Sequence, residues 1–184
     1  MGKVISMVFL LVLAGCAAPK LDQPVTQNQR TDLTRDILAL GPEIDPEEAA
    51  RAARIALTYP RQLAMEYQIT DPPLIHNAKV NAGIKPRGLC YDWADDLEAR
   101  LKLENFKTLQ LHRAIANATS ILIGHSTVIV SQRGDTMFEG IVLDPWRYGG
   151  VLFWSPTLED ERYKWVDRQE VFREKIRRAK RRQS

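Results

Sequence analysis

Three residues of this sequence have side chains that together suit covalent catalysis: a thiol, an imidazole and a carboxylate. Cys90 stands in "PRGLCYDWADDLEARL", where Pro86 and Gly88 mark a turn and the residues after the cysteine predict a helix. Backbone N–H groups and the dipole at a helix start stabilise a thiolate. His125 and Asp144 follow at gaps of 35 and 19 residues. A thiol nucleophile needs a base and a group that orients the base, so this order indicates acyl transfer through a thioester.

The elements that must position these groups are one helix and three strand-like runs. Apolar side chains at spacings of four, three and four predict the helix: Cys90, Ala94, Leu97 and Leu101. The strand-like runs are residues 106–113, 120–132 and 136–146. His125 lies in the second run, and Pro145 ends regular pairing just after Asp144 in the third. We therefore expect an α+β fold in which the cysteine, at a helix N-terminus, packs on an antiparallel sheet.

Smaller signals organise the rest of the chain. A helix is expected to begin after Asp45 as the N-cap and to end at Pro60. Residues 61–74 show no clear pattern and allow a short extended piece. A short helix that Gly83 closes precedes the cysteine, and "QRGD" and "RYGG" read as tight turns between strands.

The cysteine at a helix start, the histidine on a following strand and the "DPW" that closes the next strand resemble the transglutaminase-like, papain-related fold. The most similar group is the bacterial transglutaminase-like cysteine peptidases of the periplasm, and the resemblance covers residues 75–166. It implies that Cys90 attacks an amide carbonyl, that His125 moves the proton and that Asp144 orients the histidine. Water would then complete proteolysis or deamidation, whereas an amine would give a cross-link.

The sequence departs from papain relatives in one respect. They place a glutamine before the cysteine as an oxyanion donor, whereas the corresponding stretch here is "AGIKPRG". The substitutes are the side chains of Asn77 and Asn81 or the backbone N–H of Cys90 alone. Asn77, Trp93 and Trp146 are candidates for the substrate cleft, with core packing as the alternative for both tryptophans. His76 is either a cleft residue or a core polar group, and His112 is expected to be structural.

No metal and no cofactor are expected, because the histidines are scattered and no His, Cys, Asp and Glu residues have ligand spacing. Cys90 itself has an alternative role as a buried, inert thiol. Three functions stay open: a cysteine peptidase or transglutaminase-like acyl transferase acting on a protein or peptide of the cell envelope, a non-catalytic binding or scaffold module on the same fold, and a purely structural lipoprotein.

The N-terminus predicts the compartment. Lys3, an apolar run over 4–13 and "LAGC" up to Cys16 have the pattern of a secretory signal and resemble the bacterial lipoprotein box. An ordinary signal peptide is the alternative. We expect residues 1–15 to be a signal peptide, 16–40 a lipid-anchored tether beginning at a lipidated Cys16, 41–168 the transglutaminase-like domain and 169–184 a basic tail. Ala17 after the cysteine favours the outer membrane, facing the periplasm.

The C-terminus is strongly basic. Residues 168–184 hold eight Lys or Arg and two Glu, a net charge of +6. Such a run is expected to be a solvated helix end, or else to bind anionic lipid headgroups or another acidic surface of the envelope. Nucleic acid is not an expected partner outside the cytoplasm.

Overall fold

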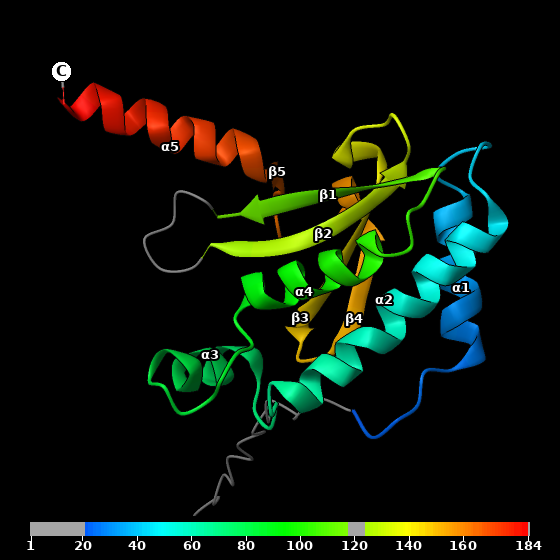
Figure 1. The fold of residues 1–184 in the computed structure, drawn as a ribbon, viewed down its shortest axis with the longest axis horizontal. Coiled ribbons are helices and arrows are strands. Elements are labelled where there is room, and N and C mark those ends of the chain that lie inside the picture. The colour runs from blue at the N-terminus through cyan, green and yellow to red at the C-terminus, as the bar shows by residue number, and fades with distance from the viewer. Residues whose placement is uncertain (1–20, 118–123, 184) are drawn as a thin grey trace, which may run out of the picture.

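The computed structural model describes residues 21–117 and 124–183, so the expected signal peptide and Cys16 lie outside the described residues (Figure 1). In these residues four helices come first, five strands follow, and a fifth helix comes last. The helices are α1 (Gln27–Leu38), α2 (Pro46–Glu66), α3 (Pro73–Asn81), α4 (Cys90–Lys102) and α5 (Arg168–Gln183). The strands are β1 (Leu109–Ala116), β2 (His125–Gln132), β3 (Ile141–Tyr148), β4 (Val151–Pro156) and β5 (Val166–Asp167), with short 3-10 turns η1 (Met137–Glu139) and η2 (Thr157–Glu159).

The strands form one antiparallel sheet in the order β4-β3-β2-β1-β5. The α+β class and the helix followed by an antiparallel meander are therefore confirmed. Each predicted strand is present, although β1 and β3 begin a few residues later than the predicted runs, and residues 120–123 of the second run lie outside the described residues.

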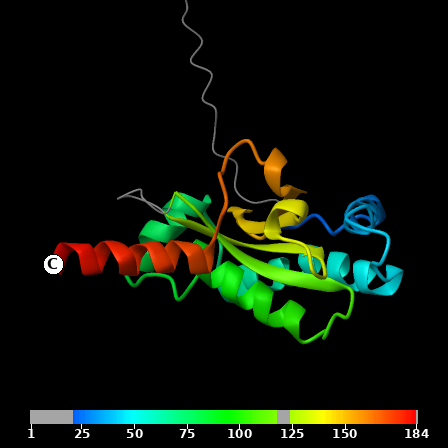
Figure 2. The same ribbon diagram turned by 90° about the horizontal axis from the view of Figure 1, so that it is seen from above.

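The sheet has two differently covered faces. Figure 2 shows α2 and α4 on one side and the segment that contains η2 on the other. Alternate residues of β2 point to opposite faces. Val128 and Val130 belong to the main core with the helices, whereas Ile129 packs with Tyr163 and Trp165 on the second face. His125 has the same parity as Ile129 and therefore belongs to the second face.

The predicted tether over 16–40 is wrong for its C-terminal half, because α1 is part of the domain. Thr26 and Gln29 form a capping box at the start of the helix. Leu33 and Ile37 are fully buried in the main core, and α1 packs along α2. These are the only regularly spaced apolar residues in a polar segment, and their burial joins α1 to the fold.

Helix α2 does not end at Pro60, as predicted, but continues to Glu66. Proline removes one hydrogen bond inside a helix and crowds the preceding turn. Here the residues after it are buried: Leu63 and Ala64 pack with Cys90 in a separate apolar cluster. That burial offsets the local cost of the proline.

The turn between β3 and β4 closes directly on this part of α2. Gly150 has φ +106°, and a Cβ at this position would lie 2.7 Å from the Cβ of Ala64 and 3.1 Å from the carbonyl oxygen of Pro60. Only glycine allows both the dihedral angle and the approach.

The basic tail is helical, as expected. Val171 is buried against the body of the protein, and α5 then extends away from the sheet in both views (Figures 1 and 2). Within the part of the chain that the structure describes, no helix combines the length and apolarity needed to cross a membrane.

Truncating Leu33 tests whether α1 is part of the domain. Leu33→Ala should lower the free energy of unfolding by about 2–5 kcal/mol, because it leaves a cavity in the core. The exposed Arg30 on the same helix provides the control, and Arg30→Ala should change stability by less than about 0.5 kcal/mol. Urea denaturation measures both; equal, small effects would return α1 to the status of a tether.

Candidate functional site

Cys90 is the first residue of α4, and the loop before it is fixed by α4 itself. The Asp92 carboxylate accepts hydrogen bonds from the backbone N–H groups of Gly88 and Leu89, both at 3.0 Å. The indole N–H of Trp93 donates to the carbonyl of Gly88 at 3.0 Å. Two side chains from the first turn of the helix thus hold the backbone that presents the thiol.

A buried histidine closes this loop from behind. The Nε2 atom of His76 lies 2.8 Å from the carbonyl oxygen of Arg87, and the ring packs on Gly88. Gly88 has φ +125°, and a Cβ there would lie 2.5 Å from the His76 ring. His76 is therefore a core polar group that shapes the loop, and it is absent from the groove beside the thiol.

His125 and Asp144 form a buried pair on neighbouring strands. The His125 Nε2 atom lies 2.7 Å from Oδ2 of Asp144, and the two side chains are 1% and 0% exposed. The pairing of β2 with β3 brings the two strands together. The predicted meeting of this imidazole and this carboxylate is confirmed.

Arg147 holds Asp144 from the other side. Its Nε donates to Oδ2 of Asp144 at 3.0 Å and its backbone N–H to Oδ1 at 3.2 Å. The other end of the guanidinium forms two hydrogen bonds to Asp160, at 3.1 and 2.6 Å, and Trp165 also donates to Asp160. Burial would raise the pKa of Asp160, but the hydrogen bonds and the charge of Arg147 outweigh it, so its pKa lies below its usual value.

An irregularity in β3 makes this arrangement fit. The register between β3 and β4 shifts between Asp144 and Tyr148, where Pro145 cannot donate to the sheet. The shift lets Asp144 and Arg147, three residues apart, meet on the same side of the strand.

Aromatic rings surround the imidazole. The ring centroids of Trp146, Tyr163 and Trp165 lie 4.7, 4.5 and 5.3 Å from that of His125. They fix the ring plane and limit the access of water to the His125–Asp144 pair.

This environment favours the protonated imidazole. Burial opposes the charge, but the carboxylate of Asp144, by its charge and its hydrogen bond, and to a lesser degree the Cys90 thiol raise the pKa of His125 to about 9. The Nδ1 atom of His125 is buried and has no hydrogen-bond partner within the described ranges. With Nε2 bonded to Asp144, Nδ1 is the nitrogen that can exchange a proton with a thiol.

The thiol lies close to this ring but outside hydrogen-bonding geometry. Cys90 is 7% exposed, and its Sγ donates to the carbonyl oxygen of Gly124, at 3.5 Å, rather than to Nδ1. Catalytic hydrogen bonds are often longer before substrate binds. Cys90, Gly124 and His125 line one groove of about 400 Å³ between the start of α4, β1, β2 and the first turns of α5.

The three candidate cleft residues lie elsewhere. Trp93 is buried against Tyr67, with the ring centroids 4.8 Å apart, so the prediction that it lines the cleft is wrong. Trp146 is also buried and donates from its indole N–H to the side-chain oxygen of Asn77 at 3.1 Å. Neither Trp146 nor Asn77 lines the groove, and Trp146 acts instead on the His125 ring.

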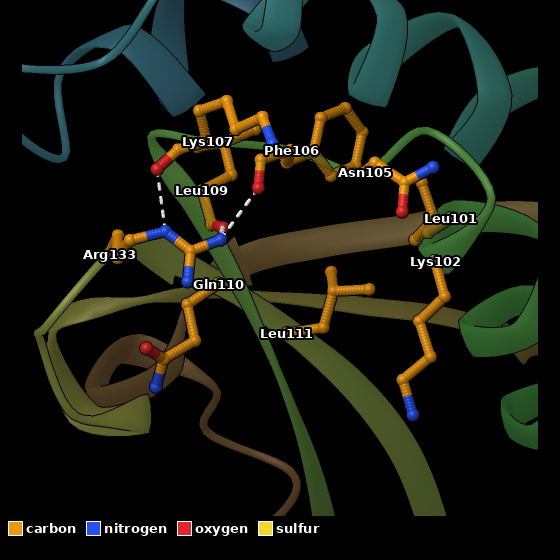
Figure 3. Close-up of a pocket in the computed structure, with 9 residues that line it drawn as sticks. All are labelled: Leu101, Lys102, Asn105, Phe106, Lys107, Leu109, Gln110, Leu111 and Arg133. Atoms are coloured by element: carbon orange, nitrogen blue, oxygen red, sulfur yellow. Dashed lines mark hydrogen bonds between the residues drawn. The ribbon is translucent and has the colours of Figure 1, made fainter.

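A second hollow, of about 500 Å³, lies at the far end of α4 and the start of β1 (Figure 3). Arg133 spans it and donates to the backbone carbonyls of Phe106 and Lys107 at 2.6 and 2.5 Å. Its lining holds no cysteine, histidine or carboxylate, so it offers no group for acyl transfer.

Two other features of the described residues complete the inventory. His112 is half-buried and bonds Ser131 at 2.8 Å, in line with the expected structural role. Across residues 21–117 and 124–183, no three His, Cys, Asp or Glu side chains are grouped closely enough to hold a metal ion.

Reasoning from the sequence missed Arg147, Asp160 and the position of Tyr163 and Trp165 around His125. The signal for Arg147 is its place in "DPWRY", three residues after Asp144. Asp160 has no such signal, because it reaches the site from a loop after β4.

The charge of His125 makes stability depend on pH. Because its pKa is about 9 in the folded state and about 6.5 when unfolded, the stabilisation is complete below about pH 6.5 and is lost as the pH rises through 9. The difference in free energy of unfolding between native protein and His125→Gln should therefore shrink by about 3 kcal/mol between pH 6 and 9.5. Urea denaturation across this range measures it.

His112→Gln is the control. Burial lowers the pKa of His112, so this residue gives no loss of stability above pH 6.5. A difference for His125→Gln that is independent of pH would contradict an imidazolium in the folded protein.

Arg147→Met should lower the free energy of unfolding by about 3–5 kcal/mol at pH 7, because it leaves the buried carboxylate of Asp160 without a cation and that of Asp144 with the imidazolium of His125 alone. Adding Asp160→Asn to this variant should restore part of the loss, since one of the uncompensated charges is then removed. Denaturation of the single and double variants decides between the outcomes. A further loss in the double variant would show that packing, and not charge, explains the role of Arg147.

Comparisons of the chain with known proteins do not identify a family for it. No model of a protein family, no curated protein and no solved structure matches the chain. What the protein does is therefore inferred from the chemistry of Cys90, His125 and Asp144.

Proposed function

We propose that this protein is a lipid-anchored cysteine amidase or peptidase of the bacterial periplasm, of the transglutaminase-like type. One observation carries the proposal: a thiol at a helix N-terminus and an imidazole paired with a buried carboxylate line the same groove. The "LAGC" pattern at Cys16 supports the anchor and the compartment. The substrate is an amide of a protein or peptide in the cell envelope.

The reaction needs no cofactor. The reactive form is a Cys90 thiolate beside the His125 imidazolium, which holds a proton on Nδ1. Sγ of Cys90 attacks the amide carbonyl carbon, forming a C–S bond. The C–N bond then breaks, His125 returns the proton to the leaving amine, and a thioester remains. Water, deprotonated by His125, attacks the thioester and releases the acid and the thiol; an amine in its place gives a new amide.

Asp144 and Arg147 keep the imidazole ready for these transfers. The carboxylate fixes the ring with Nδ1 toward the thiol and stabilises the imidazolium that forms. Arg147 positions the carboxylate through two hydrogen bonds and is a positioning residue.

The oxyanion is bound by the start of α4. Leu89, the N-cap, offers no side-chain acceptor, and the N–H of Asp92 already donates to the carbonyl oxygen of Leu89 at 2.9 Å, so the donors of the first turn are the N–H groups of Cys90 and Tyr91. These donors and the helix dipole point toward developing negative charge beside the sulfur. They take the place of the glutamine that papain relatives use.

A second function is favoured by the contact between the thiol and Gly124. A sulfur that donates to a carbonyl oxygen, in a residue only 7% exposed, is also what a non-catalytic binding module on this scaffold would have. Cys90→Ser separates the two functions, because an enzyme loses its activity in the cell and a scaffold keeps it.

Alkylation tests the catalytic proposal directly. Iodoacetamide should modify Cys90 at pH 7 at least about tenfold faster than it modifies a free cysteine, because the imidazolium stabilises the thiolate. His125→Gln should remove most of this advantage, whereas His112→Gln should leave it. Mass spectrometry of the modified peptide gives the rates. A thiol that reacts no faster than free cysteine in the native protein would contradict the proposal.

A further inference from the structure

The groove beside the thiol is basic. Apart from His125, the charged residues that line the groove in the described part of the chain are three cations, Arg113, Arg168 and Lys175, and one carboxylate, Asp95. Arg113 is buried and already bonded to Asp95, Glu98 and Ser126. Arg168 is 3.7 Å from the same carboxylate of Asp95. Asp95 and Glu98 balance the charges of Arg113 and Arg168, which leaves the positive charge of Lys175 in excess on the α5 side of the groove.

Lys175 supplies that excess. Its side chain is exposed, and no ion pair to it is present in the described part of the chain. The carboxylate nearest to it in sequence, Glu174, is bonded to Arg177 and Arg178. Lys175 is therefore available to an anionic ligand that enters the groove.

The basic lining continues along α5. Arg168, Phe172 and Lys175 are spaced by four and three residues and so share one helix face, which Ala179 and Arg182 extend. Phe172 and Ile176 leave 49% and 57% of their surface exposed beside these cations. We call this face, formed by Arg168, Phe172, Lys175, Ile176, Ala179 and Arg182, the α5 ledge.

The ledge begins in the groove and leads away from the body of the protein. Phe172 and Lys175 line the groove together with Cys90 and His125, and beyond them α5 projects from the sheet (Figures 1 and 2). A helix of 16 residues is about 24 Å long, which matches about seven residues of an extended chain.

We propose that the α5 ledge binds an acidic segment of the substrate polypeptide, which presents both carboxylates and apolar side chains on the side that meets the ledge, next to the amide that reaches Cys90. This inference rests on the proposed function and adds its substrate class. Charge complementarity identifies the occupant, since the ledge carries both cations and exposed apolar side chains. A basic or small neutral peptide would leave Lys175 unpaired and Phe172 uncovered.

A polypeptide fits better than an anionic membrane. The cations that begin the ledge lie in a groove beside the thiol, which an extended chain can enter and a bilayer surface cannot. A membrane would also be bound by cations around the whole circumference of α5, such as Arg173, which faces away from the ledge.

Binding can be measured without catalysis. The probe is a fluorescent ten-residue peptide of repeated Glu-Glu-Leu-Leu, which in extended form carries both Glu and Leu on each side, titrated by anisotropy against the full chain carrying Cys90→Ser. Lys175→Glu should weaken binding by about tenfold, and added salt should weaken it as well. Arg173→Glu makes the same change of charge on the opposite face and should weaken binding by less than about threefold. The corresponding Lys–Leu peptide should not bind.

Protection of the thiol links the ledge to the site. In the chain that retains Cys90, saturating Glu–Leu peptide should slow alkylation of Cys90 by iodoacetamide at least about fivefold, and Lys175→Glu should abolish this protection. Absence of protection would overturn the inference, because the peptide would then bind outside the groove.

Further outcomes separate this inference from the proposed function. Equal losses for Lys175→Glu and Arg173→Glu would overturn the ledge, even with a fast-reacting thiol. Binding of vesicles of phosphatidylcholine and phosphatidylglycerol that both variants weaken equally, without peptide binding, would assign α5 to the membrane and overturn it as well. If peptide binding depends on Lys175 but iodoacetamide modifies Cys90 no faster than free cysteine, the ledge is supported and only the catalytic proposal is refuted.

Discussion

The structure depends most on one buried carboxylate. Asp144 has no exposed surface and is bonded to the imidazole of His125 and to the guanidinium of Arg147, which in turn is bonded to Asp160. A buried charge is tolerated only when its partners are held in place, so the strand pairing, the irregularity in β3 and the aromatic rings around the imidazole are required together. The same partners set the charge of the histidine, and stability and chemistry share one set of contacts.

The site combines residues from the two opposite faces of the sheet. His125 and Asp144 come from the second face, whereas Cys90 comes with α4 from the helical face. They meet at the end of the sheet where β2 begins. Continuation of α2 beyond Pro60 supports this meeting, since Leu63 and Tyr67 pack in the same cluster as Cys90. Burial of Leu63 and Tyr67 in the cluster that contains Cys90 thus offsets the cost of Pro60 inside the helix.

Local patterns predicted the elements well and the network around them poorly. The start of α4 follows from Gly88 and the apolar spacing after it, and the strands follow from β-branched runs, because these signals act over a few residues. The link from Arg147 to Asp160 depends on a shift in strand register, which no single run of sequence encodes. The polar composition of α1 conceals its two buried residues. The sequence leaves Trp93 open to both a cleft role and a core role, because nearness in sequence to Cys90 does not fix which side of a helix faces the core.

The glycine turn after β3 couples two distant segments. Gly150 has no room for a methyl group against the C-terminal part of α2, so the hairpin that carries Asp144 is held against the helix end that packs in the same cluster as Cys90. The contact therefore links the position of Asp144 to that of Cys90 through α2, at residues that do not line the groove. In random mutagenesis, this contact would appear as intolerance of every replacement of Gly150. The sequence alone does not reveal the contact, because Gly150 and α2 are far apart along the chain.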